Sequence, residues 1–299
     1  MLLDDGSTDG SLQIAREAAH RDPRFRVYPR NAEGLINTLN AGIDLVRGEF
    51  IARMDADDWM HRDRLLAQQS ILKMNSDLIA TGCYVRIFPR QSMRDGRRRY
   101  EEWLHSLKDP ETLWRNRFIE CPVAHPTLMI RNEALQELRY QDHGWPEDYD
   151  LMLRILRGGP RIGMVHRRLL GWRDRPERLS RVDPRYSLDE FTRCRAWHLS
   201  HDFLRGHTQF SLWGHGRTGR ALRKSLEALG HTCSTIIDVH PRRVGQSIRG
   251  ARVLSPDALP TQSRDPMIVS VAGASPRSEI RSALAGKGYR EGVNFVCAA

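Results

Sequence analysis

Lysine is nearly absent from this chain of 299 residues, although its formal net charge is +10. Only four of the 47 basic residues are lysines, and the 43 arginines are spread over the whole length. A nucleic-acid-binding protein usually gathers its basic residues in a patch or stripe, so we predict no nucleic-acid partner. Arginine pairs phosphate oxygens in a two-pronged manner. The excess therefore suits a nucleotide, an anionic lipid carrier or a membrane surface.

Long apolar runs are also missing. Residues 267–274 form one of the longest, far below the ~20 residues that cross a bilayer. Residues 1–20 contain acids and glycines where a signal peptide has its apolar core. We predict a cytoplasmic protein whose contact with the membrane, if it has one, is peripheral and at the inner face.

Cysteine pairs and metal-ligand spacings are a third absence. The five cysteines are scattered and form no C-x-x-C pair, and no histidine lies at metal-ligand spacing from them: Cys83, Cys121, Cys194, Cys233 and Cys297. This pattern excludes a disulfide framework and a zinc site of the usual kinds. It predicts buried or indifferent thiols in a reducing compartment.

Strand-like and helix-like apolar patterns alternate through residues 1–160, which predicts an α/β layer fold. Strands are expected at 25–28, 50–54 and 78–83, and helices at 11–19, 35–46, 64–74, 111–118, 132–138, 148–157 and 188–204. Residues 86–100 read as a polar loop or hairpin, and the stretch from 160 as mixed and basic. A joint at 205–208 divides the chain into domains 1–205 and 206–299.

Three acidic clusters follow one another in the first domain. They are Asp4-Asp5-Gly6-Ser7-Thr8-Asp9, Asp55-Ala56-Asp57-Asp58 and Glu147-Asp148-Tyr149-Asp150. Carboxylates at the carboxyl ends of strands face the crevice in which α/β proteins bind ligands. Turn formation and helix capping are the alternative explanation for each cluster.

Taken together, the clusters resemble those of the family 2 glycosyltransferases, which have a GT-A fold. The resemblance covers about residues 1–200, and residues 51–54 and 62–65 beside the second cluster match closely. It implies an inverting, metal-dependent transfer of a sugar from a nucleotide-sugar donor, UDP-linked by our expectation, to a hydroxyl group. The acceptor would be a glycan or a lipid-linked molecule in the synthesis of cell-surface polysaccharide or glycoconjugate.

The resemblance assigns the donor side to the first two clusters. Asp4 and Asp5 would contact the nucleoside, with Asp5 the main contact. Asp55 and Asp57 form the family's DxD element, and their spacing puts both side chains on one side of an extended segment. Asp57 would hold Mg²⁺ or Mn²⁺, a hard cation that neutralises the diphosphate. Asp55 would reach the ribose or a metal-bound water, and Asp58 would cap the next helix.

The third cluster would serve the acceptor. Asp148 would be the general base that removes the proton of the attacking hydroxyl, and Glu147 would support it. An ordinary aspartate pKa near ~4 would suffice, because the carboxylate is then already charged at neutral pH. Direct displacement by the acceptor would invert the anomeric centre.

Further positions resemble the family less specifically. His125 in Cys121-Pro122-Val123-Ala124-His125-Pro126-Thr127 would contact the acceptor or a phosphate, and Arg53 would lie on the donor side. A purely structural role is the alternative for His125. Residues 172–173 and 178–180 resemble the segment that closes the site over the pyrophosphate. The Gln-x-x-Arg-Trp element of processive members is missing, which argues against a polymerase.

One departure from the family concerns the beginning of the chain. Family members have a strand and a helix before the Asp-Asp-Gly-Ser turn, whereas only Met1, Leu2 and Leu3 precede Asp4 here. The expectation is therefore an N-terminally truncated enzyme, about thirty residues short.

The second domain opens with a glycine-rich motif. Gly214-x-Gly216-x-x-Gly219 lies between an expected strand and helix, and Asp238 follows nineteen residues after Gly219. These features match dinucleotide-binding sites, with backbone close to phosphate and an acid on the ribose. We predict a Rossmann-like module that binds a nucleotide, with a purely structural module as the alternative.

Two other functions fit parts of the sequence. A non-catalytic nucleotide-binding or sensory protein, or an inactive fragment, fits the short N-terminus and the glycine-rich second domain. An NAD-dependent oxidoreductase fits the glycine motif alone, and no residue of that domain stands out as a hydride-transfer group.

Overall fold

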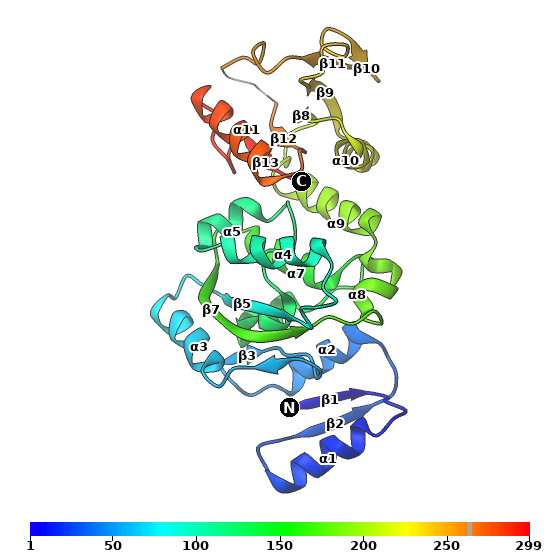
Figure 1. Ribbon diagram of the computed structural model, residues 1–299, viewed down its shortest axis with the longest axis vertical. Helices are drawn as coiled ribbons and strands as arrows, with labels where there is room; N and C mark the ends of the chain where they lie inside the picture. The colour runs from blue at the N-terminus through cyan, green and yellow to red at the C-terminus, as the bar shows by residue number, and fades with distance from the viewer. Residues whose placement is uncertain (262–264) are drawn as a thin grey trace.

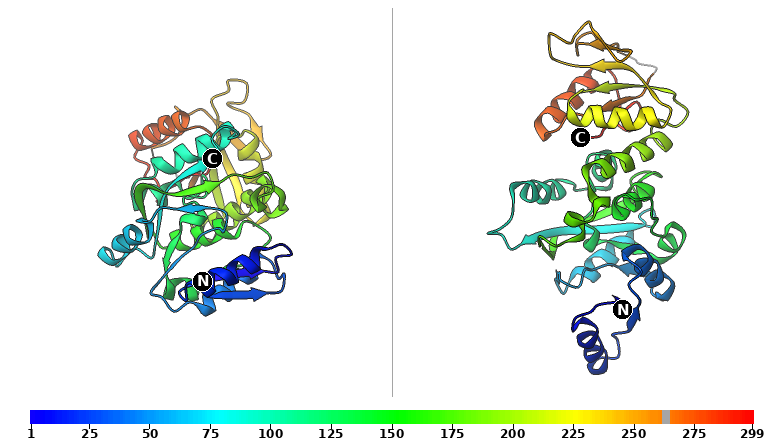
Figure 2. Two further views of the ribbon diagram at one scale, coloured as in Figure 1. Left: turned by 60° about the horizontal axis from the view of Figure 1, so that its bottom comes forward. Right: turned by 90° about the vertical axis from the view of Figure 1, so that its right-hand side faces the viewer.

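The computed structural model describes residues 1–261 and 265–299. These residues form an elongated molecule built on three β-sheets (Figure 1). A two-stranded sheet lies at one end, a five-stranded sheet in the middle and a six-stranded sheet at the other end. The right-hand view of Figure 2 shows the same succession from the side.

The two-stranded sheet pairs β1 (Leu2–Asp5) with β2 (Val27–Arg30) in parallel, and α1 (Ser11–Arg21) connects them. Among the described residues β1 pairs with no other strand. Helix α2 (Leu35–Leu45) follows and buries Ile36 and Ile43, which lie on one helix face. The first acidic cluster therefore lies in a βαβ unit, at the end of its first strand.

The middle sheet has the strand order β3-β6-β5-β7-β4. Its strands are β3 (Phe50–Ala52), β4 (Trp59–Met60), β5 (Ala80–Phe88), β6 (Met129–Arg131) and β7 (Ile162–Arg173). The helical segments around it are α3 (Arg64–Met74), α4 (Asp95–Ser106), α5 (Pro110–Asn116), η1 (His125–Thr127), α6 (Asn132–Leu138), α7 (Glu147–Leu156), α8 (Leu179–Val182), η2 (Pro184–Tyr186) and α9 (Leu188–His201). Strands β5 and β7 are parallel, and the other pairs of this sheet are antiparallel.

Two segments differ from the sequence prediction. Helix α4 occupies part of 86–100, where we predicted a loop or hairpin. Its buried Glu101 accepts hydrogen bonds from the Ile87 N–H (2.9 Å) and Arg90 Nη1 (2.7 Å), so one polar helix residue satisfies the end of β5. Strand β7 is the stretch that read as mixed and basic, because residues 166–168 in its middle are exposed while both ends are buried.

The six-stranded sheet has the order β10-β11-β9-β8-β12-β13. Its elements are β8 (Gln209–Trp213), α10 (Arg217–Ala228), β9 (Thr232–Ile237), β10 (Ser247–Ile248), β11 (Ala251–Leu254), β12 (Met267–Val269), α11 (Ala274–Gly286) and β13 (Phe295–Cys297). All pairs except β10–β11 are parallel. Figure 1 shows α10 and α11 on opposite sides of this sheet. The parallel strands follow the order 3-2-1-4-5 of doubly wound nucleotide-binding sheets.

Helix α9 connects the two larger sheets through a shared core. One hydrophobic cluster contains Tyr149 of α7, Cys194 of α9, Phe210 of β8 and Val296 of β13. Arg195 donates hydrogen bonds to the carbonyls of Ile119 (2.9 Å) and Ala298 (3.0 Å), so the C-terminal strand is fastened to the middle unit. The division into domains at residue 205 stays a prediction.

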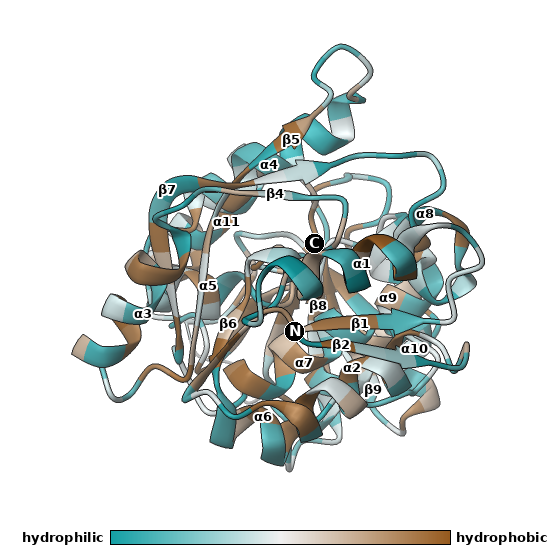
Figure 3. Ribbon diagram, turned by 90° about the horizontal axis from the view of Figure 1, so that it is seen from below, coloured by the Kyte–Doolittle hydropathy of each residue, from teal (hydrophilic) through white to brown (hydrophobic). Residues whose placement is uncertain are grey.

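The buried apolar residues agree with the composition of the chain. All five cysteines are free and buried, as predicted. No helix among the described residues is long and apolar enough to span a membrane. Figure 3 shows that surface helices such as α3 and α6 carry both hydrophobic and hydrophilic stretches.

Candidate active site

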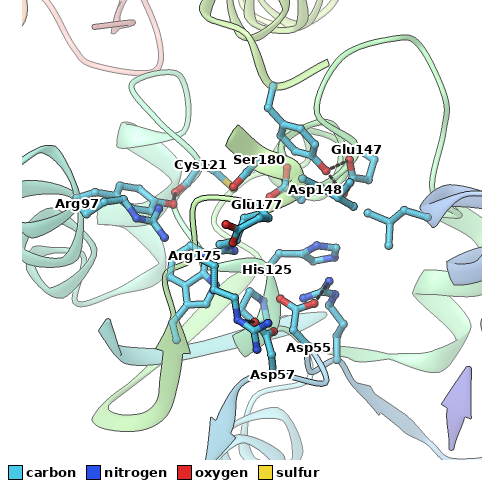
Figure 4. A pocket seen from close by; sticks show the side chains of 18 of the residues that line it. Asp55, Asp57, Arg97, Cys121, His125, Glu147, Asp148, Arg175, Glu177 and Ser180 are labelled. Carbon is cyan, nitrogen blue, oxygen red and sulfur yellow. Dashed lines mark hydrogen bonds and ion pairs between the residues drawn. The ribbon is translucent and has the colours of Figure 1, made fainter. Parts of the chain in front are cut away.

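A cavity of about 690 Å³ opens in the middle unit. Its walls come from the loop after β3, the η1 loop, the beginning of α7, helix α4, and the segment that follows β7. Figure 4 shows Asp55 and Asp57 on one side of this cavity, Glu147 and Asp148 on the opposite side, and His125 between them. The structure therefore brings together the second and third acidic clusters, which are ninety residues apart in sequence.

The first wall carries the DxD element. The Asp55 carboxylate pairs with Arg53 (Nη2–Oδ1 2.5 Å), and Asp57 pairs with Arg175 (Oδ2–Nε 3.3 Å). About a third of each aspartate side chain remains exposed to the cavity. Each carboxylate therefore remains accessible from the cavity, which suits a hard cation bound partly by a ligand and water.

Asp58 differs from its predicted role as a helix cap. Helix α3 is preceded by Asp63, and the Asp58 carboxylate instead accepts a hydrogen bond from the Arg173 N–H (2.8 Å). Burial and the charges of Asp55 and Asp57 raise the pKa of Asp58 to about 6, against the hydrogen bond from Arg173. Asp58 thus fastens the DxD loop to the end of β7.

A buried polar network on helix α3 holds the backbone of the DxD loop in place. Arg64, fully buried in α3, donates to the Arg53 carbonyl (2.8 Å) and to Gln68 Oε1 (2.9 Å). The Gln68 amide in turn donates to the carbonyls of Thr127 (2.8 Å) and Thr81 (3.0 Å). The DxD loop and the η1 loop are therefore held by the same two side chains, which sequence analysis did not single out.

Replacing Gln68 by leucine is expected to lower the free energy of unfolding by about 1–3 kcal/mol, because it leaves buried hydrogen-bonding groups of Arg64 and Thr127 unpaired. Urea unfolding followed by circular dichroism measures this change. The control is Gln69→Leu, one position further along α3 and partly exposed. Equal stability of the two variants would show that the network contributes nothing.

The opposite wall is the beginning of α7. Asp148 is half-buried, and its Oδ1 accepts a hydrogen bond from the Tyr149 N–H (2.7 Å). Glu147 is buried and accepts a hydrogen bond from the Tyr186 hydroxyl (2.7 Å to Oε2). Tyr186 belongs to η2, so the segment after β7 is attached to the acidic wall as well as to Asp57.

The pKa of Asp148 departs from the ordinary value that we predicted. Burial and the neighbouring Glu147 raise it to about 7, although the Tyr149 N–H and Arg53 favour the charged form. Burial likewise raises the pKa of Glu147. The sequence shows two adjacent acids, but it does not show that the cavity wall and the segment after β7 shield them from water. For this reason the raised pKa of Asp148 was not predicted.

His125 lies at the floor of the cavity and is 6% exposed. Its Nε2 is 2.7 Å from the Tyr140 hydroxyl oxygen. Burial and the charge of Arg53 lower the pKa of His125 well below its usual value, so the ring is neutral at pH 7. A neutral imidazole can position a polar group of a ligand without adding charge.

Arginines line the remaining wall. Arg97 of α4 and Arg178 both lie over the Trp172 ring, at 4.4 and 4.5 Å from its centroid. Arg97 Nε and Nη2 are buried without a hydrogen-bond partner in the described part of the chain. The sequence resemblance included Trp172 and Arg178 but not Arg97, because α4 was not recognised as a helix.

The first acidic cluster does not line this cavity. Asp5 Oδ1 accepts hydrogen bonds from the Glu33 N–H (3.0 Å) and the Thr38 hydroxyl (2.8 Å), and Asp4 Oδ2 from the Ser7 N–H (3.3 Å). These bonds organise the turns around β1. A nucleoside contact of Asp4 and Asp5 stays a prediction.

Asp150, third acid of its cluster, also points elsewhere. It accepts hydrogen bonds from Arg154 Nε (2.7 Å) and Trp145 Nε1 (3.2 Å) and lies 3.0 Å from His198 Nε2. With Cys194 and His198 it forms a buried group of metal-ligating residue types among the described residues. The expectation that no histidine lies at metal-ligand spacing from a cysteine was therefore wrong for Cys194 and His198, which are four residues apart on α9. Because the Asp150 carboxylate is already neutralised by Arg154, we infer that this group has a structural role and connects α7 to α9.

The glycine motif of the second domain borders a different cavity, of about 490 Å³. Gly214, Gly216 and Asp238 line it, and Gly219 lies behind Gly214. None of them reaches the first cavity.

Comparisons with known proteins find glycosyltransferases that are similar to this chain. The model of the family "Glycosyl transferase family 2" matches residues 1–139. EpsE of Bacillus subtilis is 29% identical over 195 residues, which are 63% of this chain and 67% of EpsE. The O-antigen biosynthesis glycosyltransferase WbnJ of Escherichia coli is 31% identical over 158 residues, which are 50% of this chain and 58% of WbnJ.

Among solved structures, TarS 1–349 of S. aureus is similar with a TM-score of 0.53 and 16% identity. The alignment covers 75% of this chain and 61% of the TarS chain. At this identity the likeness concerns the fold, and it confirms a GT-A-like α/β architecture. Residues 1–139 of this chain thus match the model of glycosyl transferase family 2, and the DxD element within them faces the acidic start of α7 across one cavity.

Proposed function

We propose that this protein transfers a sugar from a nucleotide-sugar donor to an acceptor hydroxyl, with inversion and with the help of a divalent cation. The observation that carries the proposal is the arrangement of Asp55 and Asp57 opposite Asp148 in one cavity. Carboxylates for a cation and a separate carboxylate for a proton are the two groups that such a reaction requires.

Asp57 and Asp55 would hold Mg²⁺ or Mn²⁺. Two partly exposed carboxylates fit such a cation, whose remaining ligands would be diphosphate oxygens and water. The cation, when bound, neutralises the charge that develops on the leaving diphosphate. Arg175 and Arg178 carry positive charge beside the same place and would assist on the phosphate oxygens.

Asp148 would accept the proton of the attacking hydroxyl. It stands at the wall opposite the DxD element. Burial raises the pKa of Cys121 well above its usual value, so this thiol of the cavity stays protonated and is a poor nucleophile. One base without a covalent intermediate produces inversion at the anomeric carbon. His125 would position the donor or acceptor, and Glu147, bonded to Tyr186, would set the pKa of Asp148.

The donor we propose is UDP-linked. The TarS structure contains UDP-GlcNAc, and the present chain shares its fold. WbnJ is named for O-antigen biosynthesis, and a glycan or lipid-linked acceptor in polysaccharide synthesis would suit the arginine-rich cavity wall. The chain covers 58% of WbnJ and 61% of the TarS chain. The donor and the acceptor are therefore part of our proposal.

Calorimetric titration with UDP, with and without Mn²⁺, tests the donor site. We expect binding that requires the cation and disappears in Asp57→Ala, because the diphosphate then lacks its counter-charge. Repeating the titration with GDP and dTDP identifies the base. Absence of binding by all three nucleotides in the presence of Mn²⁺ would contradict the proposal and favour a non-catalytic protein.

A further inference from the structure

The second cavity lies at the carboxyl ends of parallel strands in the six-stranded sheet. Trp213 ends β8, Ile237 ends β9, and Val271 follows β12, and all three line the cavity. The chain passes from β8 to β9 on one side and later returns to β12 on the other side of β8. In doubly wound sheets, ligands bind where the strand order reverses in this way.

The three glycines of the motif are required for different reasons. A Cβ atom on Gly219 would lie 2.2 Å from the Gly214 carbonyl oxygen, and one on Gly214 would lie 2.9 Å from the Ser270 carbonyl oxygen. Packing therefore excludes a side chain at both positions. At Gly216, by contrast, φ is −75° and a Cβ atom would meet nothing within 4 Å. Protein packing gives no reason for glycine at 216, but the cavity does: a side chain there would fill it.

Helix α10 begins directly after Gly216 and has no side-chain cap. The N–H groups of a first helical turn lack partners within the helix, and they attract anions. An independent second group faces the same space. His215, which lies within the motif and lines the cavity, is 8% exposed and has no protein hydrogen bond in the described part of the chain. Its ring nitrogens are therefore available to a ligand in the cavity.

Asp238 stands beside the glycine loop, because the Gly214 N–H donates to the carbonyl of Ile237 (3.0 Å). Its Oδ1 accepts from the His240 N–H (2.8 Å) and its Oδ2 from Arg243 Nη1 (3.0 Å). Each carboxylate oxygen can accept a further hydrogen bond. A pair of neighbouring hydroxyls, as on an unmodified ribose, can donate hydrogen bonds to the Asp238 carboxylate. A 2′-phosphate would instead be repelled by its negative charge.

The rest of the cavity is largely apolar. Val239 at its mouth and Ile280 and Ala283 of α11 offer a surface for a planar base. From end to end the cavity presents anion-binding backbone, a diol acceptor and an apolar surface. Its volume of about 490 Å³ is in the range of small-molecule sites.

We propose that this second cavity binds a nucleoside diphosphate group with a free ribose diol, independently of the donor site in the middle unit. The diphosphate would lie against Gly216 and the start of α10, and the ribose against Asp238. Two sources supply this chemistry, a dinucleotide of the NAD⁺ type and a nucleoside-diphosphate sugar. Its lining carboxylates, Asp238 and Glu279, are not spaced as a DxD element, and we expect binding without a divalent cation.

Titration of the full chain in the presence of EDTA tests the second cavity alone, because EDTA removes the divalent cation that the donor site requires. The background is Asp57→Ala, and the probes are ADP-ribose for the dinucleotide and UDP-GlcNAc for the nucleotide sugar. We expect one-to-one binding of at least one probe, weakened at least tenfold by Gly216→Val and also by Asp238→Asn. The matched control is Gly286→Val, at an exposed position of α11 where a Cβ atom also meets nothing within 4 Å.

Each outcome decides the proposal. Binding of ADP-ribose that is sensitive to Gly216→Val supports a dinucleotide, and the same result with UDP-GlcNAc supports a nucleotide sugar. If neither probe binds, or if Gly216→Val and Asp238→Asn both bind as tightly as the parent chain, the proposal is overturned. Thermal unfolding of each variant ensures that a loss of binding is not a loss of fold.

Discussion

Changing Asp57 to alanine is expected to reduce sugar transfer at least 10²-fold, a loss typical of removing one preorganised electrostatic stabiliser from an active site. The reason is the position of its carboxylate, which lines the cavity and pairs there with Arg175. Without it the cation loses a ligand and the departing diphosphate keeps its charge. Release of UDP from UDP-GlcNAc in the presence of Mn²⁺ and a glycan acceptor is the measurement.

Asp63→Ala is the matched control for Asp57→Ala. Asp63 is six residues further along, and its carboxylate makes an exposed ion pair with Arg167 (2.8 Å) outside the cavity. Exposed pairs of this kind contribute little, so the control should retain parental activity. Activity of Asp57→Ala within twofold of the control would sink the assignment of Asp57 as a cation ligand.

The acidic clusters show how much of the site can be predicted from the sequence. Asp55 and Asp57 follow an apolar strand, and Asp148 opens an amphipathic helix; both local patterns were readable, and the structure places these residues in one cavity. Asp4 and Asp5 had an equally clear local pattern, yet their carboxylates are used by turns around β1. Local chemistry thus locates a polar strand end but does not tell which of several strand ends share a crevice.

Other features depend on contacts between distant segments. Arg97 enters the cavity because α4 packs over β5, and its arginine-rich sequence concealed the helix. Tyr186 reaches Glu147 across 39 residues. Desolvation of Asp148 likewise results from the walls that surround it, and no sequence window contains those walls. Tertiary burial, rather than any motif, sets the pKa of the proposed base.

The pH dependence of transfer follows from that pKa. A general base acts in its deprotonated form, and the pKa of Asp148 is raised to about 7. Activity should therefore rise with pH across the interval around 7 and level off above it, whereas an aspartate with an ordinary pKa would give a flat profile there. Asp148→Asn should lower activity by about 10²–10⁴-fold, the usual contribution of a general base, and should abolish this limb.

Glu147→Gln separates the base from its neighbour. Burial is the largest cause of the raised pKa of Asp148, and the charge of Glu147 is the second. Removing that charge should move the rising limb to lower pH, while burial keeps it above the range of an exposed aspartate. Glu177→Gln removes another carboxylate of the same cavity, one that is not a main cause of the raised pKa of Asp148, and should leave the limb in place. An unshifted limb in Glu147→Gln would mean that another group titrates, and a flat profile in the parent chain would remove the basis for Asp148 as a base of raised pKa.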